Sequence, residues 1–241
     1  SGMMNSVGLA NPGIDAFVDH VGSYMDELEN RGTRVIMQMA AHSVQEMVDV
    51  VERTEELAPH ISALELNISC PNLARGGTPL GATPQQAAEV MRAVRPLTTL
   101  PLLVKMAPVN VAEIGRALEA EGANGLTLIN SLSGMSIDVH TRRSRLSKPT
   151  GGMSGPLCHN VAVRMVWECA QAVQIPICGV GGVETGEDAA EFILAGATAV
   201  SVGSANLYDP MSAPRILAEL TKWAESQGVS DIHELIGAFE C

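Results

Sequence analysis

The sequence predicts an α/β protein of the (β/α)8 TIM-barrel class, of which this chain supplies six or so strands. Three observations lead to this fold. Short apolar runs alternate with helix-patterned stretches along most of the chain. The apolar runs are nearly continuous, as expected for parallel strands that helices cover on both faces. The last two runs end in glycines, and none leads directly into the G-x-G-x-x-G of a dinucleotide-binding sheet, which disfavours the open doubly wound alternative.

Each predicted element has a local basis in the sequence. Strands are expected at 34–40, 63–69, 101–107, 125–130, 176–182 and 199–205. Helices are expected at 13–31, 43–57, 84–95, 110–121, 160–173, 186–195 and 213–227. Thr83-Pro84 and Asn110 are residue types that begin helices, and Gly122 and Gly196 stand just past predicted helix ends.

The domain organisation is predicted to be a single domain over residues 1–241. The strand count is two short of a full barrel, because residues 1–33 contain only the short stretch "MMNSVGLANPG" and one helix. The segment 133–160 is long and polar, and it joins a predicted strand to a predicted helix. Connections of this length are usually functional or mobile.

Composition restricts the classes of partner. The net charge is −12 and no run rich in Lys or Arg occurs, so neither a nucleic acid nor an anionic membrane surface is an expected partner. One small anionic ligand needs only a local site and stays compatible. The chain has five cysteines without metal-ligand spacing, so no metal site is predicted, and free thiols without a leader sequence predict a cytoplasmic protein.

Polar residues gather where the predicted strands end, and in a β/α barrel these ends meet at one mouth. Asparagine is disfavoured in strands, and its carboxamide suits a planar ligand with amide N–H and C=O edges. The alternative is that these asparagines only begin turns. The candidates are Asn67, Ser69, Cys70, Asn72, Lys105, Asn130, Ser131, Gly181, Gly182, Gly203 and Ser204.

Lys105 stands in the apolar strand "PLLVKMAP", where a buried amine is costly unless it is paired or used. A lysine whose ammonium group reaches solvent at the strand tip is the alternative. Cys70 is either a reactive thiol or an inert small apolar residue. Because paired carboxylates are not apparent at the strand ends, any acid–base role falls to Cys70 by elimination.

Glycine-rich loops indicate a phosphate site. "GGMSG" at 151–155, which includes Gly152 and Gly155, precedes a predicted helix, and "GVGGV" at 179–183 precedes another. Barrels commonly hold phosphate in the loops after the last strands, with exposed N–H groups and a helix N-terminus. Tight turns alone are the alternative. The charged residues His140, Arg142 and Arg143 are expected to face solvent.

Several motifs in order carry a family resemblance: "NSVGLANPG", "ELNISCPN", "LLVKMAP", "LTLINS", "TGGMSGP", "GVGGV" and "AVSVGSAN". From Met4 to about Leu235 the chain resembles the dihydroorotate dehydrogenases. The cysteine of "SCPN" is similar to class 1, and "RGGTPLGATPQQA" looks like the class 1B catalytic subunit. The resemblance implies a cytoplasmic FMN flavoprotein of pyrimidine biosynthesis, a homodimer, and a partner subunit carrying FAD and an iron–sulfur cluster.

The resemblance also implies roles for individual residues. Cys70 would be the general base that removes the C5 proton of dihydroorotate, and Lys105 would lie by the flavin. Substrate would be bound by Asn5, Asn67, Asn72, Asn130 and Ser131. FMN would be held by Lys105, Asn130, Gly152, Gly155, Gly181, Gly182, Gly203 and Ser204.

One departure from the family pattern concerns the N-terminus. Family members have two barrel strands ahead of "NSVGL", the second ending in a lysine that contacts flavin and substrate. Here only the four residues Ser1 to Met4 precede this motif. Two alternatives stay open beside the leading interpretation. One is an enzyme similar to dihydropyrimidine dehydrogenase, and the other is a non-catalytic fragment that binds flavin or docks a subunit.

Overall fold

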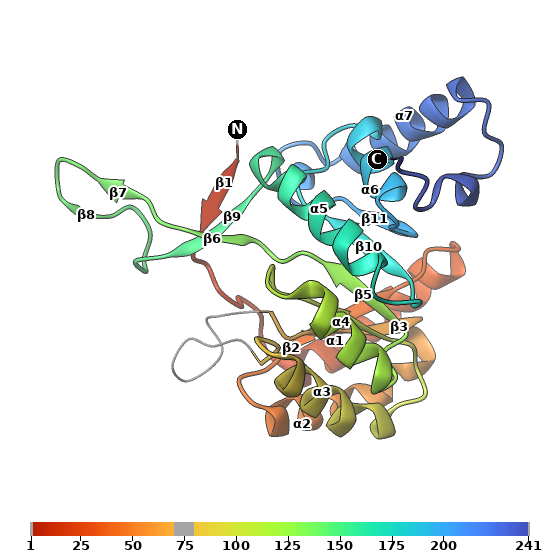
Figure 1. The fold of residues 1–241 in the computed structure, drawn as a ribbon. Helices are drawn as coiled ribbons and strands as arrows, with labels where there is room; N and C mark the ends of the chain where they lie inside the picture. Colours follow the sequence, from red (N-terminus) through yellow and green to blue (C-terminus); the bar gives the residue numbers. More distant parts are fainter. Residues whose placement is uncertain (1, 70–79, 241) are drawn as a thin grey trace. The chain divides into compact units, whose positions relative to one another are not determined.

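The computed structural model describes residues 2–69 and 80–240 and divides into two compact units (Figure 1). Unit 1 comprises Ser1–Gly8 and Thr127–Cys241, and unit 2 comprises Leu9–Leu126. The strand β5 (Gly125–Leu128) crosses the division between them. The predicted single domain over residues 1–241 therefore stays a prediction.

Unit 2 contains three parallel strands and the helices that alternate with them. The hydrogen-bonded order is β2-β3-β4, followed by β5. Each of these strands lies within its predicted range and contributes buried Met, Leu or Val side chains to the core. The elements are α1 (Ile14–Asn30), β2 (Ile36–Ala40), α2 (Val44–Thr54), η1 (Glu55–His60), β3 (Ala63–Asn67), α3 (Pro84–Val94), η2 (Arg95–Leu97), β4 (Leu102–Lys105) and α4 (Val111–Ala120).

The helix starts of unit 2 test the capping predictions. Thr83 begins α3 as expected, since its Oγ1 accepts a hydrogen bond from the Gln86 N–H at 3.3 Å and Pro84 occupies the first turn. Asn110 stands at the start of α4 but makes no capping bond with its side chain, and its φ is +43°. The predicted helix at 43–57 ends earlier, at Thr54, and continues as the 3-10 turn η1 that contains Pro59.

Unit 1 contains the C-terminal β/α units. Strands β10 and β11 are parallel, and β5 is the neighbour of β10 in the strand order. Gly196 follows α6 with a φ of +111°, as its predicted place past the helix end requires. The elements are η3 (Pro156–Cys158), α5 (His159–Ala170), β10 (Ile177–Val180), α6 (Gly186–Leu194), β11 (Ala199–Ser201), η4 (Ser204–Leu207), α7 (Ser212–Ser226) and η5 (Ile232–Leu235).

The polar connection at 133–160, for which the sequence predicts no regular element, contains short antiparallel strands. It contains β6 (Leu132–Gly134), β7 (Ile137–Asp138), β8 (Arg143–Ser144) and β9 (Gly151–Ser154). β9 pairs antiparallel with both β6 and the N-terminal β1 (Met3–Asn5), and β7 pairs with β8 in a projecting hairpin (Figure 1). The exposed positions of His140, Arg142 and Arg143 confirm that these side chains face solvent.

No helix in the described parts of the chain is long and apolar enough to cross a lipid bilayer.

Candidate active site

The polar candidates of unit 2 lie on neighbouring strands. Asn67 ends β3 and stands directly opposite Lys105 of β4 in the parallel register. Residues paired across parallel strands point to the same face of a sheet, so both side chains belong to one face. Asn67 is buried and Lys105 half-buried, as expected for groups that line a site rather than the outer surface.

Local hydrogen bonds orient the carboxamide of Asn67. Its Oδ1 accepts from the N–H and the Oγ of Ser69, at 3.2 and 2.6 Å. Its Nδ2 lies 3.5 Å from the Oε1 of Gln38, which stands on β2 and also bonds Glu65. With the oxygen occupied by two donors, the group is set to offer an N–H to a ligand.

The catalytic candidate Cys70 and the substrate-binding candidate Asn72 lie outside the described residues. Their predicted roles as base and substrate ligand therefore stay predictions.

The first cluster of unit 1 forms around β9. Asn5 on β1 is paired with Gly152 on β9, and the strand partner of Gly152 on the other side is Ser133 of β6. A Cβ added to Gly152 would lie 2.3 Å from the Oγ of Ser131, so this glycine gives space to the serine hydroxyl. Asn130 lies next in sequence, and its Oδ1 accepts from the Ser131 N–H at 2.9 Å. The structure thus brings together Asn5, Ser131 and Gly152.

The second cluster of unit 1 is the pair Gly181–Gly182 after β10, called here the diglycine loop. Both glycines have positive φ, +148° and +67°, which is a conformation that residues with a Cβ rarely adopt. A Cβ on Gly182 would lie 2.7 Å from the carbonyl oxygen of Gly155, which itself has a φ of +96°. Close approach and backbone conformation therefore both require glycine at Gly182.

The helix N-terminus beside this loop is already satisfied by protein groups. The Asp188 carboxylate accepts from the N–H groups of Glu184 and Thr185 at 2.9 and 2.8 Å, while Thr185 Oγ1 accepts from the Asp188 N–H. Glu219 accepts from the N–H of Gly186 at 2.9 Å. These bonds leave little of the α6 N-terminus for a ligand. The predicted contribution of a helix N-terminus to the phosphate site is therefore not available from α6.

Other backbone donors are available near the same place. In the described parts of the chain, the N–H groups of Gly182 and Ser204 donate no hydrogen bond to the protein. Gly203 has open space where a Cβ would stand. Asn206 closes the turn after these residues by donating to the Val202 carbonyl at 2.7 Å and accepting from Ser212 Oγ at 2.8 Å. The loops after β10 and β11 thus present N–H groups to a ligand, that of Gly182 within the diglycine loop and that of Ser204 at the start of η4.

An ionic network of unit 1 connects these two loops. The Arg215 guanidinium donates to the Glu184 carbonyl and to the Glu219 carboxylate, each at 3.0 Å, and forms an ion pair with Asp209 at 3.3 Å. The Tyr208 hydroxyl donates to Glu184. The N–H of Gly186 and the Arg215 charge lower the pKa of the Glu219 carboxyl below its usual value.

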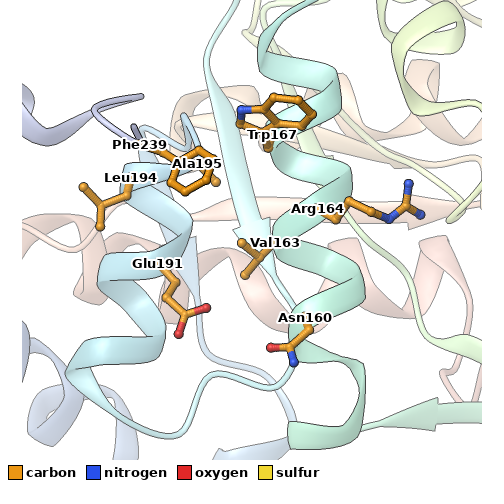
Figure 2. A pocket seen from close by; sticks show the side chains of 8 residues that line it. All are labelled: Asn160, Val163, Arg164, Trp167, Glu191, Leu194, Ala195 and Phe239. Carbon is orange, nitrogen blue, oxygen red and sulfur yellow. The ribbon is translucent and has the colours of Figure 1, made fainter. Parts of the chain in front are cut away.

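Two hollows in the structure lie apart from most of the candidates. One, of about 480 Å³ and mostly apolar, lies between α5 and α6 and contains no predicted site residue; it is lined by residues such as Val163, Trp167, Glu191 and Phe239 (Figure 2). The other, of about 540 Å³, belongs to unit 2 and includes Gln38 in its lining. Within the described ranges, no group of three or more His, Cys, Asp or Glu side chains is arranged to hold a metal ion.

Two residues near the candidates were not found from the sequence. Gln38 is a polar residue within the apolar strand "RVIMQMA", which is the signal that could have marked it. His159 is buried against the diglycine loop, but one histidine at the start of a predicted helix carries no signal of its own.

The comparisons with known proteins agree on one family. The dihydroorotate dehydrogenase family profile matches residues 1–223. The catalytic subunit of dihydroorotate dehydrogenase B (NAD(+)) from Geobacter sulfurreducens is 45% identical over 241 residues, covering 99% of this chain and 78% of that protein. The protein of the same name from Geobacillus kaustophilus is 44% identical over 239 residues, covering 98% of this chain and 75% of that protein.

A solved structure supports the fold. The crystal structure of the dihydroorotate dehydrogenase of Eimeria tenella in complex with ferulenol has a TM-score of 0.81 at 23% sequence identity, covering 98% of this chain and 71% of that one. This likeness confirms the predicted α/β barrel class, with six strands in the main sheet of this chain. The family profile and the relatives together place the chain: it belongs to the dihydroorotate dehydrogenase family.

Proposed function

We propose that this chain oxidises dihydroorotate to orotate: a base removes the proton from C5, and the hydride on C6 leaves to FMN, so that a C5=C6 double bond forms. The observation that carries the proposal is the placement of Asn67 directly opposite Lys105 on neighbouring strands. These are the positions at which the family resemblance expects a substrate carboxamide and a flavin lysine. The catalytic-subunit relatives at 44–45% identity support the same reaction.

FMN, when bound, supplies the two-electron hydride acceptor. The residues of unit 1 fit its phosphate and ribityl chain, because Gly182 and Ser204 offer N–H donors that no described protein group accepts, and Gly203 leaves open space where a Cβ would stand. Gly152, Gly155, Gly181 and Gly203, with Asn130, complete the proposed flavin-binding set of unit 1. In unit 2 the Lys105 ammonium would stabilise negative charge that develops on the flavin ring.

The substrate would be held by carboxamides and a hydroxyl. Asn67 offers an N–H because its oxygen is occupied by Ser69. Asn5, Asn72, Asn130 and Ser131 would supply the remaining donors and acceptors for the ring and carboxylate. These groups would orient C5 toward the base and C6 toward the flavin, which is what this chain contributes beside the base.

The proposed base is the Cys70 thiolate, which becomes a thiol when it takes the C5 proton. Among the cysteines that the structure describes, Cys158 is unsuited, since burial raises the pKa of its thiol and its Sγ donates to the Met153 carbonyl at 3.3 Å. Replacing Cys70 with Ala is expected to slow flavin reduction roughly 10²–10⁴-fold while flavin stays bound, as for the loss of a positioned base.

The pH dependence of the same step gives a second test of the base. An ordinary thiol, with a pKa of about 8.5, is only a few per cent thiolate at neutral pH. Flavin reduction measured by stopped flow should therefore accelerate from about pH 6 to pH 9. A flat profile over that range would exclude an unassisted Cys70 as the base.

The decisive experiment for the function is the visible spectrum of the FMN-loaded chain before and after anaerobic dihydroorotate. Bleaching by dihydroorotate, with none by dihydrouracil, is expected. Bleaching by dihydrouracil instead would favour the enzyme similar to dihydropyrimidine dehydrogenase. A flavin that binds and is bleached by neither compound would favour a non-catalytic flavin-binding chain.

The proposed protein partners of this chain are inferred from its relatives. Because these are named catalytic subunits, we infer that electrons leave this chain for a second subunit, for which the resemblance implies FAD and an iron–sulfur cluster. A homodimer of the catalytic chain and a cytoplasmic location are part of the same proposal. Copurification of the tagged chain with a flavin-containing, iron-containing subunit, together with its mass in solution, would test both associations.

A further inference from the structure

The proposed function gives no role to His159, a buried ionisable residue of unit 1. His159 is the first residue of α5, and its side chain is only 8% exposed. It follows the turn Pro156–Cys158, which places the imidazole between α5, the diglycine loop and α6. A buried polar ring in such a place needs partners for both nitrogens.

One nitrogen of His159 contacts the diglycine loop. The Nδ1 lies 3.1 Å from the carbonyl oxygen of Gly181, so this nitrogen must carry a hydrogen and donate it. The Cβ of His159 also lies against the same loop, at 3.0 Å from where a Cβ on Gly182 would stand. The imidazole therefore binds Gly181, and the Cβ that carries it lies beside Gly182.

The rest of the ring is fixed by α6. Phe192 meets the imidazole edge to face, with ring centroids 5.2 Å apart at 89°. Among the described residues, the Nε2 finds no hydrogen-bond partner of good geometry, but it lies 3.3 Å from Glu191 Oε2 and 3.8 Å from Asp188 Oδ1. Asp188 uses its other oxygen to bind the N–H groups at the start of α6, so its position is set independently of the histidine.

The bond to the Gly181 carbonyl has a consequence for Gly182. The Gly181 C=O and the Gly182 N–H belong to one planar peptide group and point in opposite directions. When His159 holds the carbonyl against α5, the Gly182 N–H is turned away from α5. This is one of the N–H groups that donates no hydrogen bond within the described parts of the chain.

We propose that His159 is a positioning residue: by binding the Gly181 carbonyl, it fixes the peptide plane of the diglycine loop so that the Gly182 N–H faces the flavin phosphate. The inference rests on the proposed function, since it requires the phosphate to bind there. Two adjacent glycines have no side chains to hold their backbone and populate many conformations. The histidine supplies from α5 the restraint that the loop lacks.

Two isosteric variants separate this role from general packing. In His159→Asn the amide nitrogen stands near the place of Nδ1 and can still donate to Gly181. In His159→Gln the amide stands near the place of Nε2 and cannot. The binding of FMN and of riboflavin, which lacks the phosphate, is measured by flavin fluorescence with the full chain. A third variant, Phe192→Leu, removes the ring contact and leaves the carbonyl bond.

The expected result is specific to the phosphate. His159→Gln should raise the Kd for FMN roughly tenfold, the worth of one oriented hydrogen bond, and leave the riboflavin Kd unchanged. His159→Asn should stay within about threefold of the parent, and Phe192→Leu should lower the urea midpoint without changing the preference for FMN. Equal FMN affinity in the Asn and Gln variants, or equal losses for FMN and riboflavin, would overturn the proposal.

The same titrations distinguish this inference from the proposed function. If the parent chain binds FMN no more tightly than riboflavin, the phosphate site itself is refuted. If the parent prefers FMN and His159→Gln retains that preference in full, only the role of His159 is refuted. Should the Gln variant fail to fold, the ³¹P chemical shift of bound FMN is compared among the parent, His159→Asn and Phe192→Leu. The proposal expects the same shift in all three proteins, because each retains a donor to Gly181. A shift that is the same in the parent and Phe192→Leu but different in His159→Asn contradicts the proposal.

Discussion

Replacing Gly182 with Ala isolates the cost of a side chain in the diglycine loop. Gly182 has a φ of +67°, and an added Cβ would lie 2.7 Å from the Gly155 carbonyl oxygen and 3.0 Å from both the His159 Cβ and the Pro156 Cα. Backbone atoms and a Cβ cannot rotate away as a flexible side-chain end can. The substitution must therefore move the loop or the turn at Gly155.

The magnitude has two parts. Placing a residue with a Cβ in the left-handed region costs about 1–2 kcal/mol. Overpacking against fixed neighbours adds typically about 1–3 kcal/mol. The sum is a loss of about 2–5 kcal/mol in the free energy of unfolding, which is a large share of the stability of an ordinary domain.

Gly228 provides a matched control within unit 1. Its φ is +73°, but nothing lies within 4 Å of an added Cβ. Gly228→Ala should therefore lose only the backbone part, about 1–2 kcal/mol. Urea unfolding followed by circular dichroism measures both variants, with the slope m checked for constancy. Equal destabilisation by the two substitutions would refute the claim that the contacts of Gly182 demand glycine.

The remaining predictions concern a cap, a carboxyl and a lysine. Thr185→Ala removes the bond to the Asp188 N–H and should cost about 1 kcal/mol by urea unfolding, a loss similar to that of Thr83→Ala at α3; no loss would contradict the capping role. Because the pKa of Glu219 is lowered in the folded protein, its stabilisation is present above the ordinary carboxyl pKa and is lost as the pH falls through the folded pKa. The stability difference between the parent and Glu219→Gln should accordingly shrink in acid, and a gap that is constant with pH would be evidence against it. Lys105→Met should lower the flavin midpoint potential on the order of 30–60 mV in a spectroelectrochemical titration, and an unchanged potential would remove Lys105 from the flavin ring.

Many of the helices and strands could be predicted because local sequence patterns determine where they begin and end. The strand β4 lies inside the predicted 101–107, and α6 ends one residue before the predicted 186–195 does. Apolar runs and capping residues act within a few positions of the chain, so they can be recognised without knowing which other elements they pack against. The strands β6 to β9 of the polar segment could not be predicted in this way. The pairing of β9 with β1 joins residues about 150 positions apart, such as Met3 and Ser154.

By itself the sequence determined the class of the fold, the ends of strands at which polar groups gather, and the motifs that identify the family. The spacing of apolar residues and the chemistry of each side chain are local properties, so they can be read in order along the chain. Only the tertiary structure decided which of these groups meet. Asn67 stands opposite Lys105 because β3 and β4 pair in one particular register. His159 binds the Gly181 carbonyl because the start of α5 packs against the loop that follows β10. Such contacts depend on packing between distant elements, which leaves no pattern in the neighbouring residues.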